Sequence, residues 1–414
     1  MAIVINGSGT VTGLAVGGLP DGSVDAGTLA TDSVTAAKIA ADSVDSAELI
    51  DGAVDDSHMA SISGRKNIII NGSMRVAQRG TSFTDPASGA YTLDRWRAGV
   101  HTSTAAANYT QEADAPTAAQ AGTNFVNCLK IDVTTADTST ADTVRYYTRY
   151  HVEGQDIAHA GFGQAGVRYM TLSFWHKHTK TGINSFGFTP NDNGRHYVAE
   201  YTQTTSDTWE KATHTFPVDT SGNWLTDNGN GMTIYFVGHI GANYQKTANA
   251  WGAGNGYGTA NQVNNFDSTS NNMRFTGVQL EMGSTATDFE QRSYGEELAL
   301  CERYYQQSYL TGAVPGQSTV NGSVYIGGSV GGASTSYIAG THNLRGQMRA
   351  NPTLVVYDIA GNSGKVRRDF FGTNNSDNSN GNIETNNNHS FLVYSSGTHN
   401  ASVLIFQFTA SAEL

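Results

Sequence analysis

The chain has 414 residues, enough for two or three domains, and only 14% of them are Asp, Glu, Lys or Arg. It holds 47 glycines, 10% aromatic residues and 7 prolines, which is typical of β-sandwiches with Gly, Asn and Asp turns and not of helical bundles. The net charge of −12 excludes a general basic field, so no nucleic-acid partner is expected.

Residues 1–20 are rich in glycine and contain one short alternating apolar stretch at Ile3 and Ile5. Such a segment can add a strand to the sheet of a partner protein, so we expect an attachment segment here. It has neither the basic start nor the long apolar run of a secretion signal. The chain also lacks a run of about twenty apolar residues. We therefore expect a soluble protein, made in a cytoplasm, without membrane insertion.

Residues 21–62 repeat with a period of ten: DGSVDAGTLA, TDSVTAAKIA, ADSVDSAELI and DGAVDDSHMA. The apolar positions form two columns, one of Val24, Val34, Val44 and Val54, the other of Leu29, Ile39, Leu49 and Met59. A unit with so few apolar residues cannot bury a core alone, so copies must supply the missing walls. We predict a stalk of three chains wound around one axis, with both columns facing inward.

A period of ten is neither a heptad nor a hendecad, which disfavours a simple coiled coil. Each unit is either a short helical turn followed by a tight turn, or a strand of an intertwined β stalk. Residues 1–62 contain nine acidic residues against Lys38 alone, a charge of −8, so an acidic disordered linker is a further alternative. The regular apolar columns favour the stalk.

Residues 63–294 alternate β-like segments with turn clusters, which predicts one large domain. The predicted strands lie at 67–80, 125–135, 144–154, 169–180, 185–190, 196–205, 210–218, 232–240 and 273–283. Helical periodicity is essentially absent here. Many short strands of this kind predict an all-β, two-sheet sandwich of the jelly-roll type.

The segment 295–309, GEELALCERYYQQSY, is the one convincing helix of this body. Glu296 and Glu297 lie in its first turn, where the helix dipole favours anions, and Leu298 and Cys301 begin an apolar face. We expect a connector that docks two domains. Residues 310–414 follow as a smaller β-sandwich. Cys128 and Cys301 match no zinc or redox spacing, which favours buried free thiols.

Several motifs, taken in order, resemble those of receptor-binding bacteriophage tail fibers. They are GTVTGLAVGGLPDGSVDAGTLATDSVTAAKIA, KNIIINGSMRVAQRGTSF followed by YTLDRW, the stretch from WGAGNGYGTAN to GEELALCERYY, MRANPTLVVYD and the closing FTASAEL. The resemblance implies a homotrimeric virion protein with a carbohydrate-binding-like jelly roll, a receptor-binding tip at 310–414 and a role in host recognition. Residues 1–20 would then attach to a tail or baseplate protein. No set of binding residues is carried over.

Two polar segments are candidate glycan sites. The loop AWGAGNGYGTAN offers an aromatic plate and amides that can read sugar hydroxyls, through Trp251, Asn255, Tyr257 and Asn261. Alternatively, Trp251 plugs the jelly roll and the glycines only make turns. The segment 373–389 is the most polar of the chain and reads as an exposed tip loop or an ordinary long hairpin; its candidates are Asn374, Asn378, Asn386 and His389.

No catalytic, metal or cofactor site is expected. His176 and His178 share one face of a predicted strand and could hold a metal, but the pair more simply marks the face running from core to rim. Asp94 beside Arg95 and Arg97 is interpreted as a structural ion pair. Acidic residues of the body are few and scattered, and the usual hydrolase and phosphate-loop motifs are missing.

The sequence therefore predicts a phage tail fiber, located in the virion, that binds a host surface glycan or an outer-membrane receptor and has no enzymatic activity. Three alternatives remain at this point. The chain could be a tailspike that depolymerises polysaccharide. It could be a structural fiber attached to the head or collar. It could also be a cellular lectin-like adhesin, which the lack of a secretion signal disfavours.

Overall fold

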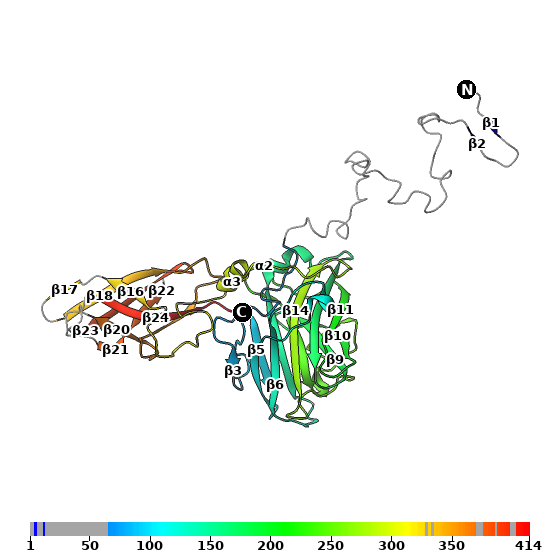
Figure 1. Cartoon of the computed structure of the whole chain (residues 1–414), viewed down its shortest axis with the longest axis horizontal. Helices are drawn as coiled ribbons and strands as arrows, with labels where there is room; N and C mark the ends of the chain where they lie inside the picture. The colour runs from blue at the N-terminus through cyan, green and yellow to red at the C-terminus, as the bar shows by residue number, and fades with distance from the viewer. Residues whose placement is uncertain are drawn as a thin grey trace. The chain divides into compact units, whose positions relative to one another are not determined.

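The computed structural model in Figure 1 describes residues 4–5, 11–12, 65–327, 330–332, 335–369, 376–385, 387–397 and 403–414. The chain divides into two compact units, Met1–Met59 and Ala60–Leu414. In the first unit, β1 (Val4–Ile5) pairs antiparallel with β2 (Val11–Thr12). The decapeptide repeat and both of its apolar columns lie outside the described residues, so the stalk stays a prediction.

An all-β architecture is confirmed for the second unit, whose larger part contains two six-stranded sheets. The first sheet has the order β13-β10-β9-β12-β7-β4, with strands Trp251–Ala253, Arg195–Gln203, Gly182–Thr189, Asn230–Ile240, Arg145–Glu153 and Trp96–His101. The second has the order β11-β8-β14-β6-β5-β3, with strands Glu210–Pro217, Tyr169–His178, Asn272–Met282, Cys128–Thr135, Ala106–Glu112 and Ser82–Phe83.

The winding of these strands is that of a jelly roll. The chain changes sheet at the connections β3–β4, β4–β5, β6–β7, β7–β8, β8–β9, β10–β11, β11–β12 and β13–β14. Short helices occupy some connections: α1 (Ala118–Ala121), α2 (Gly154–Ile157), η2 (Ala158–Ala160) and η3 (Ala242–Tyr244). Repeated crossing between two antiparallel sheets is what the alternation of strand segments and turns predicted.

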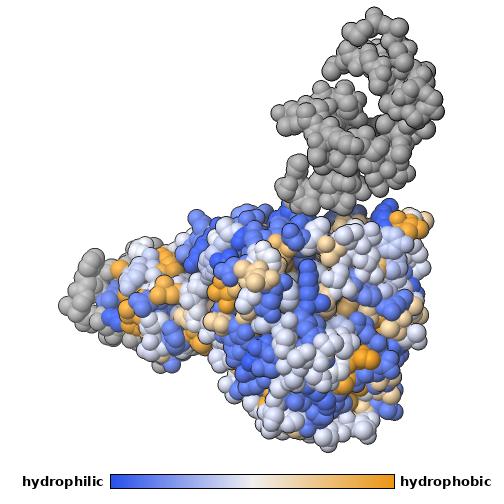
Figure 2. Space-filling model, turned by 45° about the vertical axis from the view of Figure 1, so that its right-hand side comes forward, coloured by the Kyte–Doolittle hydropathy of each residue, from blue (hydrophilic) through white to orange (hydrophobic). Residues whose placement is uncertain are grey.

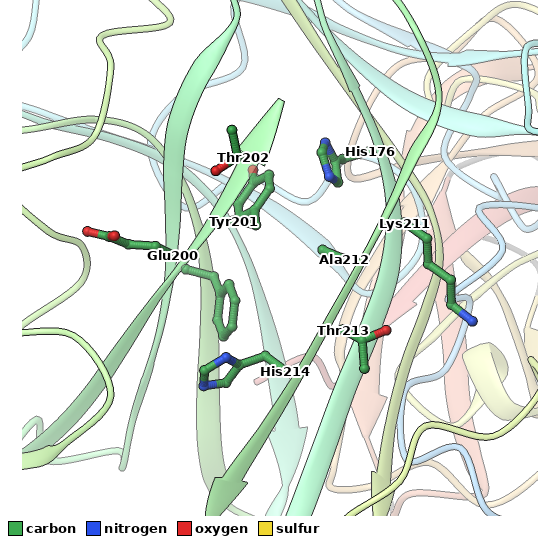
Figure 3. A pocket seen from close by; sticks show the side chains of 9 residues that line it. His176, Glu200, Tyr201, Thr202, Lys211, Ala212, Thr213 and His214 are labelled. Atoms are coloured by element: carbon green, nitrogen blue, oxygen red, sulfur yellow. The ribbon is translucent and has the colours of Figure 1, made fainter. Parts of the chain in front are cut away.

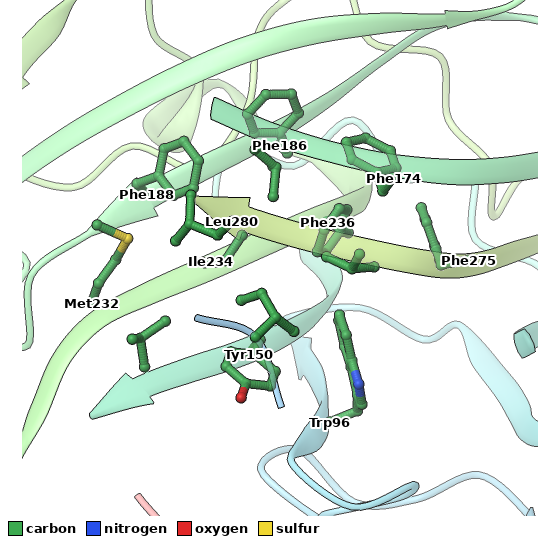
Figure 4. Packing of buried hydrophobic residues seen from close by; sticks show 14 of the residues in the cluster. Trp96, Tyr150, Phe174, Phe186, Phe188, Met232, Ile234, Phe236, Phe275 and Leu280 are labelled. Atoms are coloured by element: carbon green, nitrogen blue, oxygen red, sulfur yellow. The ribbon is translucent and has the colours of Figure 1, made fainter. Parts of the chain in front are cut away.

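Aromatic side chains from both sheets fill the space between them, as Figure 4 shows. The Phe174 ring on β8 lies 5.1 Å from the Phe236 ring on β12, and the Phe236 ring lies 5.1 Å from the Phe275 ring on β14. Every second residue of a strand points inward, so one face of each sheet supplies the core. Each fully buried side chain of this size contributes about 1.5–3 kcal/mol to folding.

The predicted strand at 67–80 is wrong, because this apolar stretch forms a buried turn-rich segment. Asn71 and Met74 both have a φ of 58°, in the left-handed region that a regular strand does not use. The segment instead supplies hydrogen bonds to β14 near its bulge, where Ile68 N donates to Leu280 O and Val278 N donates to Gly72 O. A β-carbon on Gly72 would lie 2.1 Å from the Val278 oxygen. Burial without a strand explains the misleading apolar run.

The connector helix is shorter than the predicted 295–309. Helix α3 spans Tyr294–Glu302, and Ser293 caps its N-terminus, because the Ser293 Oγ accepts a hydrogen bond from Glu296 N. Its continuation becomes β15 (Tyr305–Gln307), which pairs with the last strand of the chain. Pairing with an available sheet edge satisfies the backbone groups that a longer helix would have bonded internally.

The C-terminal part contains two further sheets that share one apolar core. One has the order β15-β24-β20-β21, with β16 and β19 also pairing with β24; these strands are Val403–Ser411 (β24), Lys365–Asp369 (β20), Ser376–Asn380 (β21), Val324–Gly327 (β16) and Thr353–Tyr357 (β19). The other has the order β17-β18-β23-β22, with strands Val330–Gly332, Thr335–Asn343, Ser390–Gly397 and Asn382–Thr385. Side chains from both sheets pack together, which is the predicted sandwich arrangement.

The segment 373–389 is not one exposed loop, because β21 and β22 occupy most of it. These strands belong to different sheets, and Gly381 between them makes the crossing. A β-carbon at Gly381 would lie 2.6 Å from Val366 and 2.9 Å from Val356, so the crossing passes tightly over the core. The polar composition misled the sequence analysis because both strands pair through their backbones.

Both cysteines are buried free thiols, as predicted. Within the described residues, no helix combines the length and the apolar character that crossing a membrane would require.

Candidate functional site

A cleft of about 230 Å³ opens between β10 of the first sheet and β11 at the edge of the second. Figure 3 shows its lining, which comes from β8, β9, β10 and β11. The lining residues are His176, Phe186, Glu200, Tyr201, Thr202, Lys211, Ala212, Thr213 and His214. The jelly-roll winding creates this opening because β10 and β11 are consecutive in the chain but lie in different sheets.

Aromatic rings form the inner wall of the cleft. Phe186 is fully buried and Tyr201 is 7% exposed, and their ring centroids lie 6.4 Å apart. The Tyr201 hydroxyl is within hydrogen-bond distance of His178 Nε2, at 3.2 Å. Burial raises the pKa of Tyr201, so its hydroxyl keeps its proton at neutral pH. An apolar wall of this kind can pack on the C–H face of a sugar ring.

Two imidazoles stand beside this wall and are held neutral. His176 Nδ1 lies 2.9 Å from Gln203 Oε1, an acceptor, so the proton sits on Nδ1 and Nε2 stays free to accept. Burial lowers the pKa of His176 to about 4. His214 Nε2 lies 3.0 Å from the Tyr197 hydroxyl, and burial lowers the pKa of this histidine too. Neutral imidazoles suit hydrogen bonding to sugar hydroxyls.

The outer edge of the cleft is polar. Thr202, Lys211 and Thr213 are exposed, and Glu200 is partly exposed. Glu200 Oε1 accepts a hydrogen bond of 3.1 Å from Asn261 Nδ2, which brings one predicted glycan residue to this edge. Carboxylate, amide and hydroxyl groups around an apolar wall are the usual composition of a site for a small polar ligand.

The other aromatic candidates of the 251–262 loop lie elsewhere. Trp251 starts β13, is partly buried, and donates from Nε1 to the Pro217 oxygen at 2.7 Å. Its ring packs edge-on against Trp224 at 5.5 Å, which matches the plug interpretation. Tyr257 is only 4% exposed and belongs to a separate aromatic cluster. The structure therefore does not bring these two rings together, and Asn255 is exposed.

Of the four candidates in the C-terminal part, Asn374 and Asn386 lie outside the described residues. Asn378 lies on β21, where only the backbone is described. His389 is exposed, and its Nδ1 lies 3.0 Å from Asn388 Oδ1. A role in glycan binding for these residues stays a prediction.

His176 and His178 point into the sandwich, with ring centroids 5.3 Å apart. They are 1% and 0% exposed, which agrees with a core-facing pair. The part of the chain that the structure describes contains no group of three His, Cys, Asp or Glu side chains placed to hold a metal ion. Their nearest polar partners are instead Gln203 and Tyr201.

Sequence reasoning missed most of the cleft, including Glu200, Tyr201, Lys211 and His214. The sequence does carry a partial signal, since Tyr201 and His214 fall on two successive predicted strands, 196–205 and 210–218. Their proximity depends on the crossing between the sheets, which the pattern of one strand cannot show.

No protein-family model matches the sequence, and no curated protein matches it either. Among solved structures, a CBM4 module is 11% identical, with 51% of this chain and 98% of that chain covered and a TM-score of 0.28. The enzymatically active domain of tailspike protein 4 of bacteriophage CBA120 is 12% identical, with 52% and 21% covered and a TM-score of 0.26. A family 11 carbohydrate-binding module from Clostridium thermocellum is 12% identical, with 49% and 97% covered and a TM-score of 0.24. Scores this low assign no family.

Proposed function

We propose that this chain is a host-recognition fiber protein of a bacteriophage, and that its jelly roll binds a glycan of the host surface in the cleft between β10 and β11. The observation that carries the proposal is the composition of the cleft. Tyr201 and Phe186 supply an apolar wall, two neutral imidazoles lie beside it, and Glu200 stands at the edge. These groups complement a sugar, whose apolar ring face can pack on the aromatic wall while its hydroxyls hydrogen-bond to the imidazoles and the carboxylate.

The sequence repeat supports the same proposal. The decapeptide columns, of which Val34 and Val44 are the central members, favour a trimeric stalk. Residues 1–20 would attach the fiber to a tail or baseplate protein. Three copies of a weak glycan site on one fiber raise the avidity without any additional contact. Reversible binding of this kind suits a particle that samples a surface before it commits.

Binding is favoured over cleavage by the carboxylates of the cleft. A retaining glycosidase places two carboxyl groups about 5–5.5 Å apart, and an inverting enzyme about 6.5–9.5 Å apart. Among the described residues that line this cleft, Glu200 is the only carboxylate. A polysaccharide-cleaving tailspike and a structural head or collar fiber are the alternatives that the experiment must separate.

The test uses the full-length protein and surface glycan extracted from candidate host cells. Glu200→Gln should raise the dissociation constant about tenfold, because a hydrogen bond to a charged group contributes about 1.5–3 kcal/mol. Glu296→Gln, at an exposed position in the first turn of α3, is the matched control and should bind like the parent. Reducing ends are assayed in the same tube.

Three results would overturn parts of the proposal. Equal binding by Glu200→Gln and the parent would remove the cleft from the glycan site. Release of reducing ends would replace the binding function with a depolymerase. No binding to any host that the phage infects would favour the structural fiber.

For the stalk, the Val34→Asp and Val44→Asp double variant should lose the trimeric native mass, because each buries an unpaired charge.

A further inference from the structure

The outer face of the first sheet carries a group of cations on β4 and β7. Their neighbours in sequence, such as Trp96 and Tyr146, point into the core, so alternate residues face outward. In the register of the two strands, Arg97 lies directly opposite Arg149, and His101 lies directly opposite Arg145. We call Arg97, Arg145 and Arg149 the arginine face.

Two like charges directly opposite each other destabilise a sheet, so the arrangement calls for a compensating anion. None of the ion pairs found among the described residues involves a member of the arginine face. Other arginines of the chain do have carboxylate partners; Arg195 pairs with Asp219 at 2.6 Å, and Arg303 pairs with Glu153. The charge of Glu413 acts on Arg97, but the carboxylate oxygens of Glu413 accept hydrogen bonds from Arg79 and Arg95.

The guanidinium groups of Arg97 and Arg149 converge on one place. Measured from the position of a β-carbon on Gly89, Arg97 Nη2 lies at 3.0 Å and Arg149 Nη2 at 3.9 Å. Both side chains are partly exposed, so an external ligand can reach them. Burial lowers the pKa of Arg97, and the charge of Arg149 lowers it further. Two converging donor groups of this kind match the geometry of one carboxylate or phosphate.

The hydrogen bonds of these arginines leave donors free. Arg97 donates from Nε to Gly89 O at 2.9 Å and from Nη1 to Leu414 O at 2.8 Å, and its Nη1 also lies 3.0 Å from His151 Nε2. The Arg97 guanidinium also hydrogen-bonds to the Tyr91 side chain. Arg149 and Arg145 make none that the described residues supply, and the Nε of each is buried without a partner.

An apolar floor lies beneath the arginine face. Gly99 sits between Arg97 and His101 on β4, and a β-carbon there would lie 2.0 Å from the Tyr147 ring. The missing side chain lets Tyr147 lie against the strand, where it is 2% exposed. Arg145 lies 4.1 Å from the centroid of the Tyr244 ring, a cation–π distance. An apolar floor strengthens the attraction between an arginine and a bound anion because it lowers the local dielectric constant.

We propose that Arg97 and Arg149 together bind an anionic substituent of the glycan, a carboxylate or a phosphate, and that Arg145 binds a second one. Arg145 and Arg149 are four residues apart on one strand, about 13 Å. A polymer with anionic groups on successive or alternate sugars can satisfy both positions. This inference rests on the proposed function, since it names the class of glycan, an acidic polysaccharide, and places a second contact outside the cleft.

The test measures binding of the full-length protein to three probes: polygalacturonate, polyglycerol phosphate and a neutral galactan. The variants are Arg149→Gln and Arg145→Gln. Arg168→Gln is the matched control, because Arg168 is also partly exposed and has no ion pair among the described residues. Urea midpoints of all variants establish that each one folds. NMR signals of the arginine Nε–H groups, recorded during titration, report contact at each site directly.

We expect Arg149→Gln to weaken binding of at least one acidic probe about tenfold or more, and Arg168→Gln to leave it unchanged. The acidic probe that responds, polygalacturonate or polyglycerol phosphate, identifies the anionic group. Arg149→Lys should show an intermediate loss, because the charge stays while the planar fork is lost. The Arg149 Nε–H signal should shift with the acidic probe and not with the galactan.

The outcomes also separate this inference from the proposed function. Equal weakening by Arg168→Gln would indicate general attraction of polyanions and overturn the inference. Unchanged binding in both arginine variants would show that the arginines only cover the tyrosine floor, even if the galactan or a host glycan still binds through the cleft. Binding of acidic probes through Arg149, with no effect of Glu200→Gln on any glycan, would support the arginine site and remove the cleft. If no glycan binds, both proposals fall.

Discussion

Glu413 forms ion pairs with Arg79 and the buried Arg95, and its replacement by Gln should destabilise the second unit strongly. Its Oε2 accepts a hydrogen bond of 2.5 Å from Arg95 Nη1, and its Oε1 accepts one of 2.9 Å from Arg79 Nη2. The side chains of Arg95 and Glu413 are only 1% and 4% exposed. Removing one partner of a buried ion pair costs about 3–5 kcal/mol, because the remaining charge stays in a poorly solvated place.

The remaining contacts of the two arginines decide where in that range the effect falls. Arg95 keeps a hydrogen bond of 2.5 Å to the His151 oxygen and a cation–π contact of 3.5 Å with the Tyr304 ring. Arg79 keeps Asp94, with Nη1 3.7 Å from Oδ1. Gln also retains a hydrogen-bonding oxygen at position 413. We therefore expect Glu413→Gln to cost about 3 kcal/mol, the lower end of the range, and Glu413→Ala to cost more.

Urea unfolding of the full-length variant, followed by tryptophan fluorescence, measures this loss. Asp288→Asn is the matched control, since Asp288 is exposed and forms no ion pair with any residue that the structure describes. The control should stay within about 0.5 kcal/mol of the parent. A loss below 1 kcal/mol for Glu413→Gln would show that Arg95 is adequately solvated or compensated without its carboxylate, and the reasoning from burial would be refuted.

Three further predictions follow from the buried groups. Acid should destabilise the fold between about pH 6.5 and pH 4, because burial lowers the pKa of His176 to about 4 in the folded chain, while the unfolded chain has a value near 6.5 and takes up the proton first. The loss of stability attributable to this residue is about 3 kcal/mol. Urea titrations at pH 7 and pH 4 should therefore show a smaller pH effect for His176→Gln than for the parent. Gly99→Ala should lower the free energy of unfolding by at least the roughly 1–3 kcal/mol typical of overpacking, and so lower the thermal midpoint, because its β-carbon would overlap the Tyr147 ring. An unchanged midpoint would show that the ring can move at no cost. Burial raises the pKa of Cys128 to about 12 and also raises the pKa of Cys301. Neither thiol should therefore react with an aromatic disulfide reagent at pH 8 until urea unfolds the chain. Rapid labelling in the folded state would contradict this burial.

The sequence patterns predicted the jelly roll because period-two alternation is local and strong in its inner strands. The stretch 169–180 illustrates this, since Phe174 and His176 share a parity and both point into the core. The pattern failed where burial occurs without strand pairing. The apolar side chains within 67–80 are buried beneath α3 and against β14 without pairing as a strand. The positive φ values of Asn71 and Met74 cannot be predicted from a hydrophobicity pattern.

The candidate sites were harder to predict than the fold, for a physical reason. A site is made by side chains from strands that meet only after the sheets form, so its residues are distant in sequence. Asn261, a candidate sugar-reading amide, lies at the edge of the cleft, where it donates a hydrogen bond to Glu200. For Trp251 the sequence leaves a sugar-binding plate and a plug of the jelly roll open, and its hydrogen bond from Nε1 to the Pro217 oxygen, inside an aromatic cluster, supports the plug. An aromatic residue in a glycine-rich loop therefore indicates packing as readily as binding, and only its partners distinguish the two.

Net charge hid the arginine face for a similar reason. Residues 1–62 account for −8 of the total of −12, so the remainder of the chain carries only −4. A sum near neutrality is compatible with paired charges everywhere, and equally with acids and bases kept on separate surfaces. Register decides between these cases: Arg97 lies opposite Arg149 as a like-charge pair. Among the described residues, neither arginine forms an ion pair with an acidic side chain. Natural sheets usually avoid this juxtaposition, so its presence on a solvent-facing surface is better explained by a ligand that supplies the negative charge than by stability. Such a ligand would bind less tightly as salt concentration rises, whereas the apolar contacts of a sugar with Phe186 and Tyr201 in the cleft would depend on salt much less.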